Sequence, residues 1–192
     1  MGASTLASCD DSFARPMTPK LKVFLGAWVP SLALDQVSKA WVTNSISYAD
    51  QVTVIDGFFY LTYVRNPGAA FSLFAESPEA FRKFFFVGVA LVAILLIFSF
   101  YRQLAPGDRL SALALGLVLG GASGNLIDRV FRSFEVVDFL RFELWRGYSW
   151  PDFNFADSFI VVGVLLLVLE LLAAESESRA DGDPPGTDAV ES

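Results

Sequence analysis

Long apolar stretches separated by polar loops run through most of this chain. Four stretches are long enough to cross a hydrocarbon core about 30 Å thick: residues 21–42, 84–101, 110–127 and 157–173. The second and third contain no charged side chain, whereas the first carries Asp35 and Lys39. The pattern therefore predicts an all-α membrane protein with four transmembrane helices.

The composition agrees with a membrane protein and narrows the possible chemistry. The chain is 54% hydrophobic and 18% charged, and its mean hydropathy is +0.49, whereas soluble domains are about 25% charged. The net charge of −7 lies mostly in residues 175–192, and there is no basic patch, so we expect no nucleic-acid partner. The chain has no histidine and one cysteine. His-based triads, His-containing metal sites and internal disulfides are therefore excluded, and acid–base chemistry must use Asp, Glu, Lys, Tyr or water.

The length of 192 residues allows one domain. We expect a polar N-terminal tail at 1–19, a membrane domain at 20–174, and an acidic tail at 175–192 that has too few apolar side chains to fold. Four spans would place both termini on one side and two longer loops, about 43–83 and 128–156, on the other. Lys and Arg are almost equally frequent on the two sides, so the positive-inside rule does not orient the chain.

Both longer loops contain extended-looking segments. Asp56-Gly57 separates a β-branched run from an aromatic run, which predicts a β-hairpin. Residues 134–144 are mixed and extended-looking, and aromatic residues that favour a membrane interface follow them. We therefore expect the two loops to form a small platform on the membrane face. After the hairpin, Ser77-Pro78-Glu79 has the residue types that begin a helix.

Charged residues at membrane depth are costly and often functional. Asp35 and Lys39 are four residues apart and can pair, and a structural ion pair is the simpler explanation. Asn125, Asp128 and Arg129 lie close together at the end of the third span, where a structural polar cluster and a ligand contact are both open. Gly116, Gly120 and Gly124 in the same span form a small-residue stripe that favours close helix packing.

Two aspartates, Asp138 and Asp157, could support hydrolysis. Taken singly, Asp138 could point to water from an apolar run, and Asp157 could complement the dipole of the fourth helix. Both loop ends, however, return to the membrane face that holds Asn125 and Arg129. Two carboxylates within a few Å of each other tend to share a proton, so that one serves as base and the other as acid. Such a pair can activate water against an amide carbonyl.

Five sequence blocks occur in the order and spacing of the bacterial lipoprotein signal peptidases, also called signal peptidase II. The blocks are residues 34–39, 65–71, 124–129, 136–139 and 153–158. The chain resembles this family over about residues 20–172, and the acidic tail lies outside the resemblance.

The resemblance implies a fold and an orientation. It implies four spanning helices with both termini cytoplasmic, a small extracytoplasmic β-cradle and a short helix lying against the membrane surface. The protein would then be a multi-pass protein of the bacterial cytoplasmic membrane, with its active site near the extracytoplasmic face. We expect a monomer that needs no cofactor and no metal.

The resemblance also implies an activity and site residues. The activity is cleavage of a prolipoprotein just before its diacylglyceryl-modified cysteine, at the membrane lipid. Asp138 and Asp157 match the catalytic pair. Positions that line the substrate or support the pair are Asn66, Asn125, Arg129 and Asn154. Positions with a structural or supporting role are Asp35, Lys39, Gly68 and Asp128.

Two other kinds of protein fit parts of the pattern. A small proton-coupled transporter or channel subunit would use Asp35, Asp128 and Asp157 to relay protons. Paired half-repeats are typical of transporters, and the sequence shows no internal repeat. A non-catalytic membrane assembly factor would use its loop Asn and Asp residues only to bind a partner.

Overall fold

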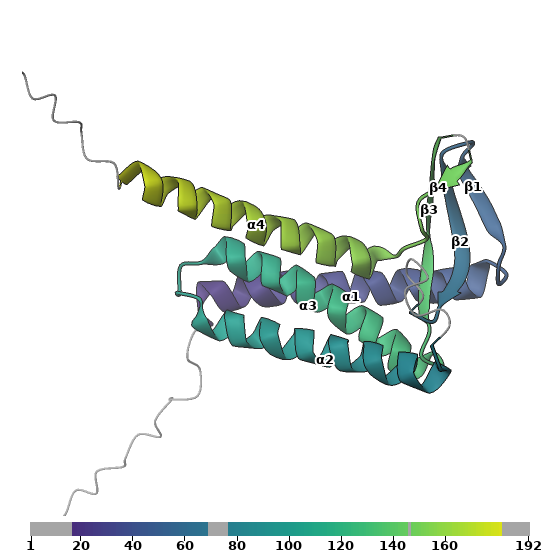
Figure 1. Ribbon diagram of the computed structural model, residues 1–192, viewed down its shortest axis with the longest axis horizontal. Helices are drawn as coiled ribbons and strands as arrows, with labels where there is room; N and C mark the ends of the chain where they lie inside the picture. Colours follow the sequence, from purple (N-terminus) through teal and green to yellow (C-terminus); the bar gives the residue numbers. More distant parts are fainter. Residues whose placement is uncertain (1–16, 69–76, 146, 182–192) are drawn as a thin grey trace, which may run out of the picture.

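Four long helices form a bundle that carries a small sheet at one end. The computed structural model describes residues 17–68, 77–145 and 147–181. The helices are α1 (Pro19–Ser45), α2 (Glu79–Gln103), α3 (Arg109–Phe131) and α4 (Phe155–Asp181). In Figure 1 both ends of the described chain lie at the end of the bundle opposite the sheet. The helix predicted to begin near Pro78 is confirmed as α2.

Three of the four helices are long and apolar enough to cross a membrane. They are α2, α3 and the stretch Phe155–Ser176 of α4. The 27-residue α1 is not among these candidates because Lys20, Lys22, Asp35 and Lys39 lower its apolar content. Asp35 and Lys39 are both fully buried in the bundle, so these two charges face protein.

The glycine stripe of α3 permits its close contact with α1. A Cβ atom on Gly116 would lie 2.6 Å from the backbone oxygen of Phe24, and one on Gly120 would overlap the Ser31 side chain. Helix α3 packs against α1, α2 and α4 and is the central helix of the bundle. The predicted close packing along this stripe is confirmed.

The sheet joins the two longer loops. Its strands β1 (Gln51–Ile55), β2 (Phe59–Asn66), β3 (Val136–Trp145) and β4 (Tyr148–Ser149) pair in that order and are antiparallel. The predicted hairpin is confirmed: Gly57 adopts a φ of +69° in the β1–β2 turn, a conformation that favours glycine. Pairing of β2 with β3 brings residues far apart in the sequence together.

Apolar side chains fix the sheet on the end of the bundle. Val42 and Ile46 at the end of α1 belong to one buried cluster with Tyr63 of β2 and Val137 and Phe139 of β3. Burying such side chains contributes about 1.5–3 kcal/mol each. The cluster therefore holds β2 and β3 against the end of α1.

One sequence-based expectation needs correction. The acidic tail is helical from residue 175 to Asp181, because α4 continues through it, and Arg179 pairs with Glu175 one helical turn away at 2.5 Å. Residues 1–16 and 182–192, which hold most of the two predicted tails, lie outside the described residues. Within the described part of the chain, no short helix separate from α1–α4 occurs, so the expected membrane-surface helix is not found there.

Candidate functional site

The Asp138 carboxylate is almost completely buried beside the first residues of α4. Its side chain lies on β3, and the residue is 2% exposed. Asn66 pairs with Val136 across β2 and β3, so it shares a sheet face with Asp138. The Asn66 amide donates to Asp138 Oδ2 at 3.0 Å, and the Asn154 amide donates to Oδ1 at 2.7 Å. Both oxygens therefore accept a hydrogen bond.

The segment before α4 brings Asp157 to the same place. Phe153 bridges to Leu140 of β3, which sets Asn154 beside Asp138. The Asn154 side chain accepts from the Asp157 backbone N–H at 3.1 Å, while Asp157 Oδ2 accepts from the Asn154 N–H at 3.2 Å. This reciprocal cap satisfies the first turn of α4. Asn154 therefore contacts both aspartates.

Both aspartates line one cavity of about 290 Å³. Its other lining residues are Asn66, Gly68, Phe86, Asn125, Arg129, Val136, Trp150, Pro151, Asp152 and Phe153. The structure thus unites residues from four of the five sequence blocks around one hollow. The sequence did not point to Phe86, Trp150 or Asp152, because an aromatic residue or a surface acid has no distinctive spacing.

Burial and charge change the proton affinity of Asp138. Burial first, and then the negative charge of Asp157, raise the pKa of its carboxyl from 3.8 to about 7. Hydrogen bonds from Asn66 and Asn154 oppose the rise because they favour the ionised form. A proton is therefore available on this carboxyl near neutral pH.

We predict that Asp138→Asn changes the pH dependence of stability. Between about pH 4 and pH 7 the folded protein retains a proton that the unfolded chain releases, so this group's contribution to stability is lost as pH rises. Asn cannot titrate. The stability of the variant relative to native protein should therefore increase over this window, by up to roughly 4 kcal/mol. Thermal unfolding of both proteins in detergent at several pH values measures the trend. A difference that stays constant with pH would contradict it.

A buried ion cluster lies directly behind the two aspartates. Lys39 Nζ contacts Asp35 at 2.9 Å and Asp128 at 2.8 Å, and all three side chains are 0% exposed. The predicted Asp35–Lys39 pair is confirmed, and Asp128 joins it from α3. Gln36 also donates to both acids, at 3.1 and 3.3 Å, a contact that sequence reasoning missed.

Two of the remaining predicted residues shape the cavity wall. Gly68 has a φ of +93°, and its N–H donates to Asn66 Oδ1 at 2.9 Å, which turns the Asn66 amide nitrogen toward Asp138. Arg129 donates to the backbone oxygen of Asn125 at 3.1 Å and lies over the Phe86 ring at 5.4 Å. Arg129 is thereby held at the cavity without an ion pair to either aspartate among the described residues.

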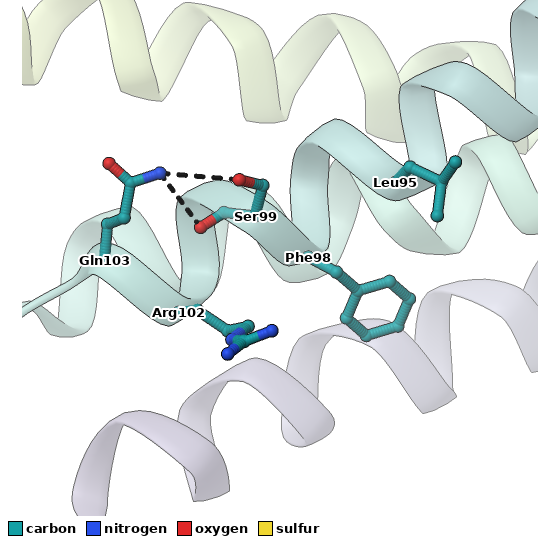
Figure 2. Close-up of a pocket in the computed structure, with 5 residues that line it drawn as sticks. All are labelled: Leu95, Phe98, Ser99, Arg102 and Gln103. Carbon is teal, nitrogen blue, oxygen red and sulfur yellow. Dashed lines mark hydrogen bonds between the residues drawn. The ribbon is translucent and has the colours of Figure 1, made fainter.

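A larger hollow elsewhere on the molecule carries no comparable chemistry. It occupies about 530 Å³ on the C-terminal half of α2, and its lining residues are Leu95, Phe98, Ser99, Arg102 and Gln103. Figure 2 shows the Gln103 amide turned back toward Ser99 of its own helix. This hollow has no carboxylate. Among the described residues there is also no cluster of three metal-ligating side chains.

Comparison with known proteins places the chain in a family. The sequence model of the family described as Signal peptidase (SPase) II matches residues 28–173. The chain is 43% identical to the lipoprotein signal peptidase of Geobacter sulfurreducens over 159 residues, which cover 83% of this chain and 97% of that protein. It is 44% identical to the lipoprotein signal peptidase of Syntrophus aciditrophicus, with 76% and 89% covered.

Solved structures are similar as well. One bacterial membrane enzyme, solved by the in meso method at 1.9 Å resolution, matches with a TM-score of 0.70 and 32% identity, covering 79% of this chain and 94% of that one. A second, at 2.3 Å resolution, matches with a TM-score of 0.72 and 28% identity, covering 88% and 96%. The chain belongs to the signal peptidase II family of aspartic peptidases.

Proposed function

We propose that this protein removes the signal peptide of prolipoproteins by cleaving the peptide bond before the diacylglyceryl-modified cysteine. The observation that carries the proposal is the shared cavity of Asp138 and Asp157 at the sheet end of an apolar bundle. We call these two residues the dyad. Family membership supports the reaction class, and it leaves no support for a transporter, a channel subunit or an assembly factor.

The mechanism follows from two carboxylates with one proton between them. A water molecule held by the dyad gives a proton to the ionised carboxylate as its oxygen attacks the scissile carbonyl carbon. The protonated carboxyl then supplies the proton that the leaving amine needs when the C–N bond breaks. Arg129 and the Asn125 amide line the same cavity and are candidate hydrogen-bond donors to the developing oxyanion.

We further propose that α1 is a fourth span, with both termini in the cytoplasm and the sheet as an extracytoplasmic cradle. The start of α1 and the end of α4 both lie away from the sheet (Figure 1), which supports an even number of crossings. The buried charges of α1 face protein, so they need not enter lipid. Large apolar side chains on α2 and α4 are exposed and would face acyl chains: Phe84, Leu95, Leu169 and Leu171.

A lipid-modified substrate suits the surroundings of the dyad. Trp150, Phe153 and Asp157 line both the dyad cavity and an apolar hollow of about 370 Å³ along α4, whose wall continues to Val161 and Val162. An acyl chain in this hollow would hold the adjacent peptide bond at the dyad. Both carboxylates come from one chain, so we expect a monomer to be active. Because the two carboxylates can activate water themselves, we also expect no need for a cofactor.

The test is a cleavage assay with the purified full chain in detergent. We expect a diacylglyceryl-modified precursor to yield a product whose N-terminal residue is the modified cysteine, as measured by mass spectrometry. The same precursor without the lipid should yield none. No product from the lipidated precursor would overturn the proposed function, and equal cleavage of both precursors would overturn the lipid requirement.

A further inference from the structure

We propose that Lys39 is a positioning residue for the dyad: through the side-chain amide of Asn125 it holds Asp157 as the ionised partner, which leaves the shared proton on Asp138. This inference rests on the proposed function and assigns the base to Asp157 and the acid to Asp138.

Each of the three contacts of Lys39 leads to a different part of the site. Its Nζ donates to Asn125 Oδ1 at 3.0 Å and pairs with Asp35 and Asp128. Asp35 Oδ1 accepts from the backbone N–H of Ala156 at 3.0 Å, directly before Asp157. Asp128 Oδ2 accepts from the backbone N–H of Val137 at 3.2 Å, directly before Asp138. One ammonium therefore links α1 and α3 to the chain segments that carry both members of the dyad.

The orientation of the Asn125 amide is fixed from two sides. Its Oδ1 accepts from Lys39 and also from the Asn154 amide at 3.2 Å, so its Nδ2 must point the other way. That nitrogen donates to Asp157 Oδ1 at 2.8 Å. Donation to a carboxylate favours its charged form. Asp157 also begins α4, where the helix dipole favours a negative charge.

Charged groups from every neighbouring element act on the dyad. Lys39 of α1 and Arg129 of α3 favour the ionised state of the dyad, whereas the acids Asp35 of α1 and Asp128 of α3 oppose it. The dyad members, Asp157 on α4 and Asp138 on β3, oppose each other's ionisation. The influence of Lys39 reaches Asp138 as well, where its positive charge lowers the pKa. Removing Lys39 should therefore move both limbs of the pH profile for cleavage to higher pH.

The simpler explanation is that Lys39 only neutralises two buried acids. Lys39→Met alone would remove the cation from Asp35 and leave Asp128 with Arg132, whose Nε lies 3.5 Å from Asp128 Oδ1, and unpairing a buried acid is strongly destabilising. The test variant is therefore Lys39→Met combined with Asp35→Asn, which keeps the net charge of the three groups at that of the native cluster. Asn at position 35 retains an oxygen for the Ala156 N–H. Asp35→Asn alone is the matched control, because it keeps the link from Lys39 to Asn125.

The measurement is kcat and KM for the lipidated precursor across pH 4–9, with thermal unfolding as the folding check. We expect the double variant to show its acid limb about one pH unit higher than both the native protein and the control, with kcat lowered about tenfold or more and KM within about threefold. A purely neutralising role would leave the acid limb of the double variant at the pH of the native limb, because the two clusters carry the same net charge. That result, with native cleavage intact, would overturn the positioning role while leaving the proposed function standing.

Asn125→Ala in the otherwise native chain tests the same link if the double variant does not fold. It removes the amide between Lys39 and Asp157 but keeps Lys39 paired with Asp35 and Asp128, and we expect the same upward movement of the acid limb. In the double-variant background the same change should have little further effect, because the link is already broken. An unmoved acid limb in Asn125→Ala would overturn the proposal. Absence of cleavage by the native protein would instead indicate that the proposed function is wrong.

Discussion

Asp138→Asn and Asp157→Asn are each expected to abolish cleavage of the lipidated precursor. Loss of a general acid or base lowers a rate by about 10²–10⁴-fold. Either variant retains one carboxylate, which cannot serve as both the base for water and the acid for the leaving amine. Both side chains would still accept a hydrogen bond, so we expect the variants to insert and fold. Product formation by mass spectrometry, together with thermal unfolding in detergent, measures both effects.

The cavity provides a matched control in Asp152. Asp152 lines the same hollow, but its carboxylate accepts both bonds of an Arg141 fork at 2.7 and 2.6 Å, so it is held in an ion pair with Arg141. Asp152→Asn should retain cleavage within about threefold, the loss expected from a partly exposed ion pair. Full turnover by either dyad variant, or an equal loss in Asp152→Asn, would contradict the assignment of the two aspartates.

The secondary structure and the meeting of the two aspartates could be predicted because they depend on local patterns and on simple topology. Uncharged runs define α2 and α3, and Asp56-Gly57 defines the hairpin. Helices that cross the bundle in turn return both long loops to one end, so Asp138 and Asp157 meet there.

The supporting contacts could not be predicted because they depend on tertiary register. Asp128 is one helical turn from Asn125 and Gly124, and nothing in that spacing shows that its carboxylate meets Lys39 and the backbone of Val137. The composition also did not predict that α4 continues beyond residue 174. An apolar helix can extend into an acidic segment even when the residues of that segment favour disorder.

Gly121→Ala should reduce cleavage about 100-fold although the residue is not among those that line the dyad cavity. Gly121 is on α3 and lies outside the stripe that the sequence made evident. A Cβ there would overlap the backbone oxygen of Ala156 and lie 2.7 Å from Ile160 Cγ1, so the start of α4 must move away from α3. Ala156 directly precedes Asp157, and a displacement of about 1 Å at a reacting group can cost about 10²-fold in rate.

Gly88→Ala is the control for the same chemical change in a helix. Gly88 lies in α2, and among the described residues no atom outside its own helical surroundings lies within 4 Å of a Cβ added there. Since Ala is favoured over Gly in a helix by about 1 kcal/mol, this variant should be at least as stable as native protein and equally active. Gly121→Ala should instead lose about 1–3 kcal/mol, the usual cost of overpacking. Comparable kcat/KM values for the two variants would mean that the α3–α4 contact does not set the position of Asp157. The dyad geometry would then have to depend on Asn154 and the Lys39 cluster alone.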